Sequence, residues 1–355
     1  MFKINNFLRV NCVRVKMLQH IASFQLTSEL VLNWCSIGAC CALKEQSGNH
    51  AALTILAQDY SVVLCKISLQ GYGIVYGWVI SMRSKYMSHD LSKYTAVILC
   101  GGQGTRIRAV AEDRPKPMVD VGGRPILWHI MKIYSSFGVK KFVLALGHQG
   151  EKVVEYFENY HAHNCDFSMK VGRPTERTFF RGSDACDDDV DDWEITFAYT
   201  GVDTMTGGRV KRIKPYIKED HFFCTYGDGV SDVDLRLVFA EHLRMGNVAT
   251  MVGVHLPTTF GVIEPSENGK IELFREKPVL PGFINGGFFC FTPEIFDQIE
   301  GDATVLEDKP FHSLVKQGKI GMVPHKGFWH AMDHYKDYTT LNDMWKKDAA
   351  PWRVW

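Results

Sequence analysis

Apolar and polar positions follow two different patterns along the chain, and the change falls near residue 94. Before it, apolar stretches alternate with polar ones without a clear period, although 60–67 and 73–80 have the composition of strands. After it, short continuous apolar runs alternate with segments of helical period. Continuous apolar runs of this length are typical of strands that are buried on both faces.

The regular part predicts a series of alternating strands and helices. Strands are expected over 95–100, 141–146, 222–226 and 249–254, and helices over 125–137, 151–160 and 234–245. In the first helix Ile126, Ile130 and Ile133 share one face, while Pro125 suits the first turn and Gly138 the C-terminal end. This alternation predicts an α/β fold with a mostly parallel mixed sheet flanked by helices.

The same change of pattern predicts the domain organisation. We expect one domain over 94–355 and an N-terminal extension over 1–93 in which no motif with a chemical role is found. Two interpretations of the extension stay open. It is either a non-catalytic segment, including an upstream reading of the gene with Met82 or Met87 as the start, or a small accessory domain.

Composition and charge narrow the function. The 355 residues are 46% hydrophobic and carry a formal net charge of zero, so no general attraction to nucleic acid or to an acidic membrane is expected. The 10 cysteines are scattered without zinc-site spacing, which is typical of reduced thiols in a cytoplasmic protein. No apolar run reaches the roughly 18 to 20 residues that cross a bilayer.

Two further features, an acidic tract and three histidines, are considered as metal ligands, and both are interpreted without a metal. The acidic tract 184–192 is interpreted as a solvated loop because its like charges repel, with a metal site as the alternative. His129, His148 and His330 lack metal-ligand spacing and are interpreted as structural.

The strongest chemical signal is Cys100-Gly-Gly-Gln-Gly-Thr-Arg106, followed by Arg114-Pro-Lys-Pro-Met118. A glycine-rich turn after a buried strand lets backbone N–H groups approach phosphate oxygens closely. The Rossmann fingerprint is excluded because its third glycine is missing, and the P-loop because no glycine is followed by Lys and Ser or Thr. Arg106 and Lys116 add the positive charge that a reacting triphosphate needs, whereas the alternative is an ordinary surface turn.

This glycine-rich string with Pro115-Lys116-Pro117 resembles the signature of the sugar-phosphate nucleotidyltransferases. Six later segments resemble the branch that uses CTP and glucose 1-phosphate: 123–131, 204–209, 225–229, 274–278, 284–289 and 327–333, together with the ending 350–355. The resemblance covers about 94–355 and implies a Rossmann-like nucleotidyltransferase fold. Cys100 and Arg114 depart from the usual Ala and Lys, and the stretch around the acidic tract is longer.

The resemblance also implies the site residues. Nucleotide binding is expected from Leu99, Cys100, Gly101, Gly102, Gln103, Gly104, Thr105, Arg106, Lys116, Thr204, Arg209 and Gly227. Sugar binding is expected from Glu276, Lys277, Asn285 and Gly286, Mg²⁺ binding from Asp228 and Asp333, and catalysis from Arg106, Lys116 and Asp228. The simpler alternatives are a turn aspartate for Asp228, a helix cap for Asp333 and an exposed ion pair for Glu276 and Lys277.

The activity implied is transfer of a cytidylyl group from CTP to glucose 1-phosphate by a homo-oligomeric enzyme of polysaccharide biosynthesis, with Trp345, Trp352 and Trp355 available for an interface. Three alternatives stay open. They are the same chemistry with another nucleotide or sugar phosphate, a catalytically silent paralogue that binds sugar nucleotides, and an NAD-dependent dehydrogenase, which the failed fingerprint disfavours.

Overall fold

The structure, a computed structural model, describes residues 40–42, 54–57, 60–63, 83–84, 89–102, 104, 114–180, 191–256, 258, 260–279 and 282–355. The chain divides into two compact units, Met1–Met87 and Ser88–Trp355. In the first unit four short antiparallel strands pair in the order β1-β2-β3-β4: Cys40–Ala42, Thr54–Ala57, Tyr60–Val63 and Arg83–Ser84. The strand expected over 60–67 is thus described over its first half, and the strand expected over 73–80 lies outside the described residues.

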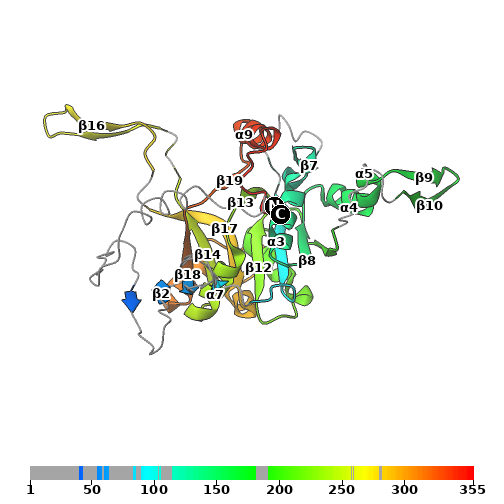
Figure 1. Cartoon of the computed structure of the whole chain (residues 1–355), viewed down its shortest axis with the longest axis horizontal. Coiled ribbons are helices and arrows are strands. Elements are labelled where there is room, and N and C mark those ends of the chain that lie inside the picture. The colour runs from blue at the N-terminus through cyan, green and yellow to red at the C-terminus, as the bar shows by residue number, and fades with distance from the viewer. Residues whose placement is uncertain are drawn as a thin grey trace, which may run out of the picture. The chain divides into compact units, whose positions relative to one another are not determined.

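The second unit is built on a seven-stranded sheet in the order β11-β8-β5-β12-β17-β14-β18 (Figure 1). Its strands are β5 (Thr95–Cys100), β8 (Lys141–Leu146), β11 (Glu194–Tyr199), β12 (Phe222–Tyr226), β14 (Ala249–Val254), β17 (Ile284–Phe291) and β18 (Ile320–His325). Only β17 runs antiparallel to its neighbours in this sheet. The predicted α/β fold with a mostly parallel mixed sheet is therefore confirmed.

Helices cover both faces of this sheet, and each face has its own hydrophobic core. The α-helices of the unit are α3 (Ile126–Ser136), α4 (Gly150–Glu158), α5 (Tyr160–Asn164), α6 (Thr206–Arg212), α7 (Leu235–Met245), α8 (Lys309–Gln317) and α9 (Tyr335–Lys346), and its 3₁₀ turns are η2 (Lys116–Met118), η3 (Lys214–Tyr216) and η4 (Pro293–Gln298). Helices α3, α4 and α7 contribute to one core, and α6, η4 and α8 to the other. The buried apolar runs of the strands supply side chains to both cores, as their continuous pattern predicted.

The predicted elements correspond closely to those of the structure. The four expected strands are β5, β8, β12 and β14, and the expected helices over 125–137 and 234–245 are α3 and α7. Asp234 caps α7 by accepting hydrogen bonds from the backbone of Arg236 and Leu237, and Gly246 ends it with a left-handed φ of 61°. The helix expected over 151–160 is divided into α4 and α5.

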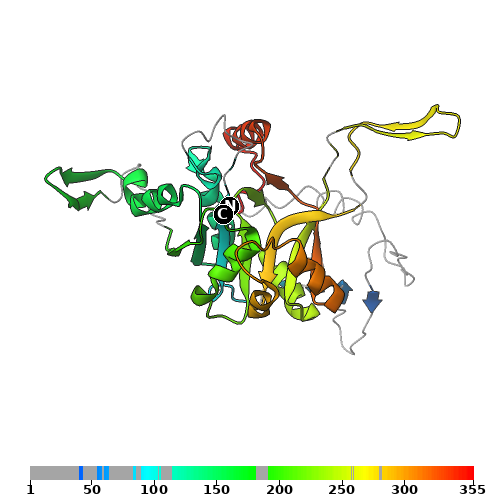
Figure 2. The same ribbon diagram turned by 180° about the vertical axis from the view of Figure 1, so that it is seen from behind.

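Four two-stranded pairs complete the unit: β6 (Asp120–Val121) with β7 (Arg124–Pro125), β9 (Phe167–Lys170) with β10 (Arg173–Phe179), β13 (Gly229–Ser231) with β19 (Trp329–Ala331), and β15 (Val262–Pro265) with β16 (Ile271–Arg275). Figures 1 and 2 show the β9–β10 and β15–β16 hairpins projecting from opposite ends of the sheet. On β15–β16, Ile263 and Phe274 lie directly opposite each other and are 53% and 60% exposed.

The C-terminal tail packs within its own unit. Trp352 is fully buried and donates a hydrogen bond from Nε1 to Nδ1 of His129, 3.3 Å away. The ring of Trp355 lies 5.6 Å from that of Trp128, between centroids. Trp352 therefore stabilises α3 of the same chain and is not available for the interface that the sequence suggested.

Three other expectations from the sequence can be compared with the structure: the solvated acidic tract, the reduced cysteines and the lack of a membrane-spanning segment. Within the acidic tract, Asp191 is not solvated: it accepts hydrogen bonds from Lys132 at 2.8 Å and Tyr160 at 2.6 Å, whereas 184–190 lies outside the described residues. Cys100, Cys224 and Cys290 are buried free thiols, but Cys165 is disulfide-bonded, which the expectation of reduced thiols did not anticipate. Among the described helices, none is both long and apolar enough to span a bilayer.

Candidate active site

A pocket of about 600 Å³ opens at the carboxyl ends of β5 and β12, where the chain turns out of the sheet. It is lined by Leu99, Gly101, Gly102, Gly104, Lys116, Pro117, Val202, Asp203, Thr204, Met205, Thr206, Arg209, Tyr226, Gly227, Asp228 and Asp333. Ligands of open α/β sheets bind at this edge because the loops that follow parallel strands meet there. The described part of the glycine-rich turn therefore lies where its pattern predicted.

Arg209 forms one wall of this pocket and holds the surrounding loops together. Its side chain comes from α6, is 5% exposed and donates to the carbonyl oxygens of Gly101 (3.0 Å), Gly201 (2.8 Å) and Val202 (3.1 Å). Further donations go to the carbonyl oxygen of Leu146 and the hydroxyl of Thr200. In these contacts the guanidinium is directed at the protein, so its observed role is to shape the wall.

The glycine at position 101 is required by this arginine. A Cβ at Gly101 would lie 2.0 Å from Cζ of Arg209, which no side chain can do without displacing the guanidinium. The glycine-rich turn thus serves two ends at once: it exposes backbone N–H groups, and it leaves room for a buried cation directly behind them.

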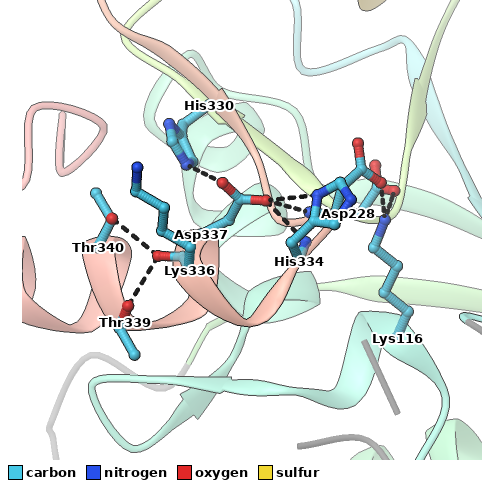
Figure 3. Close-up of polar contacts among 9 residues, drawn as sticks. Lys116, Asp228, His330, His334, Lys336, Asp337, Thr339 and Thr340 are labelled. Atoms are coloured by element: carbon cyan, nitrogen blue, oxygen red, sulfur yellow. Dashed lines mark hydrogen bonds and ion pairs between the residues drawn. The ribbon is translucent and has the colours of Figure 1, made fainter. Parts of the chain in front are cut away.

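Lys116 also lines the pocket and lies between two carboxylates that are distant in sequence. Its Nζ is 2.6 Å from Oδ2 of Asp228 (Figure 3). The same Nζ is 2.6 Å from Oδ1 of Asp333. The lysine side chain is 14% exposed, against 27% for Asp228 and 43% for Asp333. Burial alone would lower the pKa of Lys116, but the two carboxylates outweigh it and raise the pKa, so the ammonium stays charged.

Local structure aims each member of this cluster. Lys116 begins η2 between Pro115 and Pro117, which restrict the backbone on both sides. Asp228 occupies the turn between β12 and β13. Asp333 directly precedes α9, whose N-cap is His334, so the interpretation of Asp333 as the helix cap is wrong.

Asp337 in the first turn of α9 fixes the backbone next to Asp333. Its Oδ2 accepts hydrogen bonds from the backbone N–H groups of Asp333 (3.0 Å) and His334 (2.7 Å), and its Oδ1 lies 3.2 Å from Nε2 of His330 (Figure 3). The carboxylate thereby satisfies two backbone donors at the helix start. The Asp333 side chain is left to face Lys116.

The structure gathers most of the residues predicted to bind the nucleotide and Mg²⁺. Leu99, Gly101, Gly102, Gly104, Lys116, Thr204, Arg209, Gly227, Asp228 and Asp333 all line the pocket, whereas Gln103, Thr105 and Arg106 lie outside the described residues. The side chain of Cys100 is buried in the core, where burial raises its pKa, so that only its backbone lies near the turn.

Of the residues predicted to bind the sugar, two lie in β17, where one of them reaches the pocket wall, and two lie outside the pocket lining. Asn285 in β17 reaches the pocket wall by donating from Nδ2 to the hydroxyl of Tyr226, 3.2 Å away, and the carbonyl oxygen of Gly286 accepts from Trp329 at 2.6 Å. Glu276 and Lys277 are 63% and 59% exposed and lie 3.5 Å apart after β16, outside the pocket lining. Their arrangement in this structure is that of an exposed ion pair.

Sequence reasoning missed several pocket residues. Pro117 and Tyr226 stand beside predicted site residues in motifs already recognised, so closer attention to those motifs would have found them. Thr206 has only its place in the predicted nucleotide loop as a signal. Glu307, which binds both Thr206 and Tyr226, has no local signal, because its partners are 101 and 81 residues away.

The position and charge of this pocket place the molecule among α/β proteins that bind nucleotides at the edge of an open sheet. A model of the nucleotidyl transferase family matches residues 95–329, and the chain belongs to that family. The resemblance seen in the glycine-rich string is thus confirmed, and the protein is an enzyme of the nucleotidyltransferase type.

Two bacterial relatives are similar to about three quarters of the chain. A probable glucose-1-phosphate cytidylyltransferase of Bacillus subtilis is 42% identical over 262 residues, which cover 73% of this chain and 99% of the relative. The glucose-1-phosphate cytidylyltransferase of Salmonella typhi is 40% identical with the same coverage. Among solved structures, HddC from Yersinia pseudotuberculosis has a TM-score of 0.52 at 21% identity and covers 71% of this chain and 99% of its own, a likeness of fold alone.

Proposed function

We propose that this protein transfers a cytidylyl group from CTP to α-D-glucose 1-phosphate, giving CDP-glucose and pyrophosphate. The observation that carries the proposal is the cluster of Lys116, Asp228 and Asp333 beside the glycine-rich turn. The specificity for CTP and glucose 1-phosphate is supported by the two cytidylyltransferases that share 40–42% of their residues with this chain over nearly their full length.

In the proposed reaction an oxygen of the sugar phosphate attacks the α-phosphorus of CTP in line. A phosphorus–oxygen bond forms, the bond to the bridging oxygen of the β-phosphate breaks, and pyrophosphate leaves with the electron pair. No side chain has to remove a proton, since a phosphate monoester has a second pKa near 6 and is already anionic at neutral pH. The protein's contribution is position and charge.

Lys116 supplies part of this charge. An ammonium has three N–H donors, and in the described contacts the two carboxylates receive two of them, so a phosphate oxygen can accept the third. The raised pKa keeps the lysine charged through the neutral range. We propose Arg106 as the second cation, because it follows the glycine-rich turn directly in the sequence.

Asp228 and Asp333 would hold Mg²⁺. The residues fit this ion because two hard carboxylate oxygens from different elements converge on one cation, the Lys116 ammonium, at 2.6 Å each. Bound there, Mg²⁺ would supply positive charge beside the triphosphate oxygens.

We also propose that the enzyme is a homo-oligomer of the cytoplasm, which supplies activated sugar for polysaccharide synthesis. The exposed apolar side chains of β15–β16 support the association, because an isolated two-stranded hairpin is marginally stable in water and exposed apolar patches mark interfaces. Sedimentation of the full chain tests this point, and a monomer at micromolar concentration would contradict it.

The test of the proposed reaction is pyrophosphate release across ATP, CTP, GTP and UTP, each combined with several sugar 1-phosphates. We expect the highest kcat/KM for CTP with glucose 1-phosphate. A higher value for another pair would replace the substrates but keep the chemistry. No release from any pair, together with tight binding of a sugar nucleotide, would show a regulatory binding protein instead.

A further inference from the structure

One carboxylate joins two side chains of the pocket wall. Tyr226 ends β12 and lines the pocket, and its hydroxyl donates a hydrogen bond to Oε1 of Glu307. Thr206 begins α6, also lines the pocket, and donates to Oε2 of the same carboxylate at 2.8 Å. Glu307 itself comes from the turn before α8, so three separate segments meet at one charged group.

This arrangement fixes the direction of both hydroxyl groups. An ionised carboxylate only accepts hydrogen bonds, so each hydroxyl must give it its single proton. Thr206 Oγ1 in turn accepts from the backbone N–H of Leu306 at 3.0 Å.

Asn285 confirms this direction at the tyrosine oxygen. Its Oδ1 accepts from the backbone N–H of Gly287 at 2.9 Å, and because that partner can only donate, the orientation of the amide is determined. Nδ2 must then donate to Tyr226, 3.2 Å away. The phenolic oxygen therefore gives its proton to Glu307, accepts one bond from Asn285 and keeps acceptor capacity for a ligand.

The tyrosine ring is held in place as well as its hydroxyl. Gly287 has a left-handed φ of 75°, and a Cβ there would lie 2.4 Å from Cδ2 of Tyr226, so the ring occupies space that only glycine leaves. Phe289 packs against the ring edge to face at 5.7 Å between centroids. A side chain with fixed ring and fixed hydroxyl direction is suited to select a ligand group by its hydrogen-bonding type.

We propose that Tyr226 determines specificity as a pure hydrogen-bond acceptor for one hydroxyl of the sugar 1-phosphate, and that Glu307 is the positioning residue that makes it so. The inference rests on the proposed function for its substrates. The sugar is favoured over the ribose of the nucleotide because Tyr226 is bonded to Asn285 of β17, and β17 pairs with β12 on the edge opposite β5, the strand that leads into the glycine-rich turn.

The test is a scan of monodeoxyfluoro analogues of glucose 1-phosphate, since fluorine cannot donate a hydrogen bond. For each ring position the ratio of kcat/KM for glucose 1-phosphate to kcat/KM for the analogue is measured with the full chain. In the wild type we expect a ratio of about tenfold or more at the position that faces Tyr226, the loss of one buried hydrogen bond. Tyr226→Phe should bring that ratio close to one and leave the other positions unchanged.

Glu307→Gln tests the positioning role. The amide can donate to one of the two hydroxyls, which lets Tyr226 turn its proton toward the ligand, so the same ratio should shrink to a few-fold. The double variant should resemble Tyr226→Phe, because both changes act on one interaction. Matched controls are Tyr216→Phe and Glu300→Gln, whose side chains are exposed.

Three results would overturn the inference. The first is a wild type that turns over both substrates but shows the same ratios as Tyr226→Phe and Glu307→Gln. The second is an equal loss at every ring position, which a merely structural role would give. The third is discrimination lost against 2′- or 3′-deoxy-CTP instead, which assigns Tyr226 to the ribose. A wild type without turnover contradicts the proposed function, and the Kd of CDP-glucose for wild type and both variants then decides the inference separately.

Discussion

At the scale of single residues, the pocket depends on a balance of charge around Lys116. The ammonium of Lys116 lies between the carboxylates of Asp228 and Asp333 and contacts both. Under the proposed function the same two carboxylates would hold Mg²⁺, so we expect them to matter more to the reaction than to the fold.

Asp333→Asn should therefore cut turnover by orders of magnitude and leave the fold intact. The amide has the same shape but loses the charge that faces Lys116 and that would hold Mg²⁺. Steady-state pyrophosphate release as a function of Mg²⁺ concentration, with circular dichroism for the fold, measures this. Asp343→Asn on the exposed side of α9 is the matched control. An unchanged rate and an unchanged Mg²⁺ dependence in Asp333→Asn would remove this residue from the metal site.

A second residue-scale prediction concerns pH. Burial lowers the pKa of His129 from 6.5 to about 4, and the imidazole bonds the carbonyl oxygen of Val121 at 2.7 Å. In that window the unfolded chain binds a proton that the folded protein does not, so the free energy of unfolding should fall as the pH drops from about 6.5 toward 4. The loss should approach about 1.4 kcal/mol per pH unit for this group.

Urea unfolding at pH 7 and pH 5 measures the effect of His129. His129→Gln keeps a donor but cannot titrate, so it should lose less free energy between the two pH values than the wild type. His312→Gln, at an exposed histidine, should behave as the wild type does. Identical losses in wild type and His129→Gln would contradict the assignment, whatever the stability of the variant at pH 7.

At the scale of elements, the first turn of helix α9 fixes the backbone beside Asp333, the carboxylate that we propose binds Mg²⁺. Removing the Asp337 side chain leaves two backbone donors without an acceptor. We expect Asp337→Ala to lose about 0.5 to 2 kcal/mol of stability, as other caps do, and to reduce kcat because Asp333 is no longer held. Chemical denaturation and pyrophosphate release measure the two effects. Thr339→Ala, two residues further along α9, is the control for a general effect of substitution in this helix. Full activity in Asp337→Ala would contradict the positioning role.

The elements also show what the sequence could predict. Strands β5, β8, β12 and β14 were found because a parallel sheet covered on both faces demands continuous apolar runs. Strand β17 was not predicted, although it contains the apolar run Phe288 to Phe291. Its start, Ile284 to Gly287, has two glycines and therefore has the composition of a loop. The exposed hairpins β9–β10 and β15–β16 were not predicted either, because neither has a buried face that would require an alternation of apolar and polar residues.

The site shows the same division. The glycine-rich turn and Lys116 could be predicted because they form a local motif with its own chemistry, whereas Asp228 and Asp333 were predicted only from the family resemblance. The contacts of Arg209 with four backbone carbonyls and the Tyr226–Glu307 pair could not, because they are made between segments that only the folded sheet brings together.

At the scale of the whole molecule, every residue assigned to the site follows residue 94, and the second unit has its own sheet and two cores. We propose that the activity resides there. Deleting residues 1–81 should leave kcat/KM within about twofold of the full chain, because no assigned group is removed. A truncated protein that is folded by circular dichroism but inactive would show that the N-terminal segment takes part in function.

The most direct test of the central claim is the rate of pyrophosphate release from CTP and glucose 1-phosphate by wild type, Lys116→Ala and Lys116→Arg. Removing the ammonium should cost about 2.7 to 4 kcal/mol of transition-state stabilisation, a factor of roughly 10² to 10³ in rate. Arginine should restore only part, because a forked guanidinium does not replace a point charge between two carboxylates. Binding of CDP-glucose should weaken less than the rate falls. Equal rates in wild type and Lys116→Ala would contradict the account.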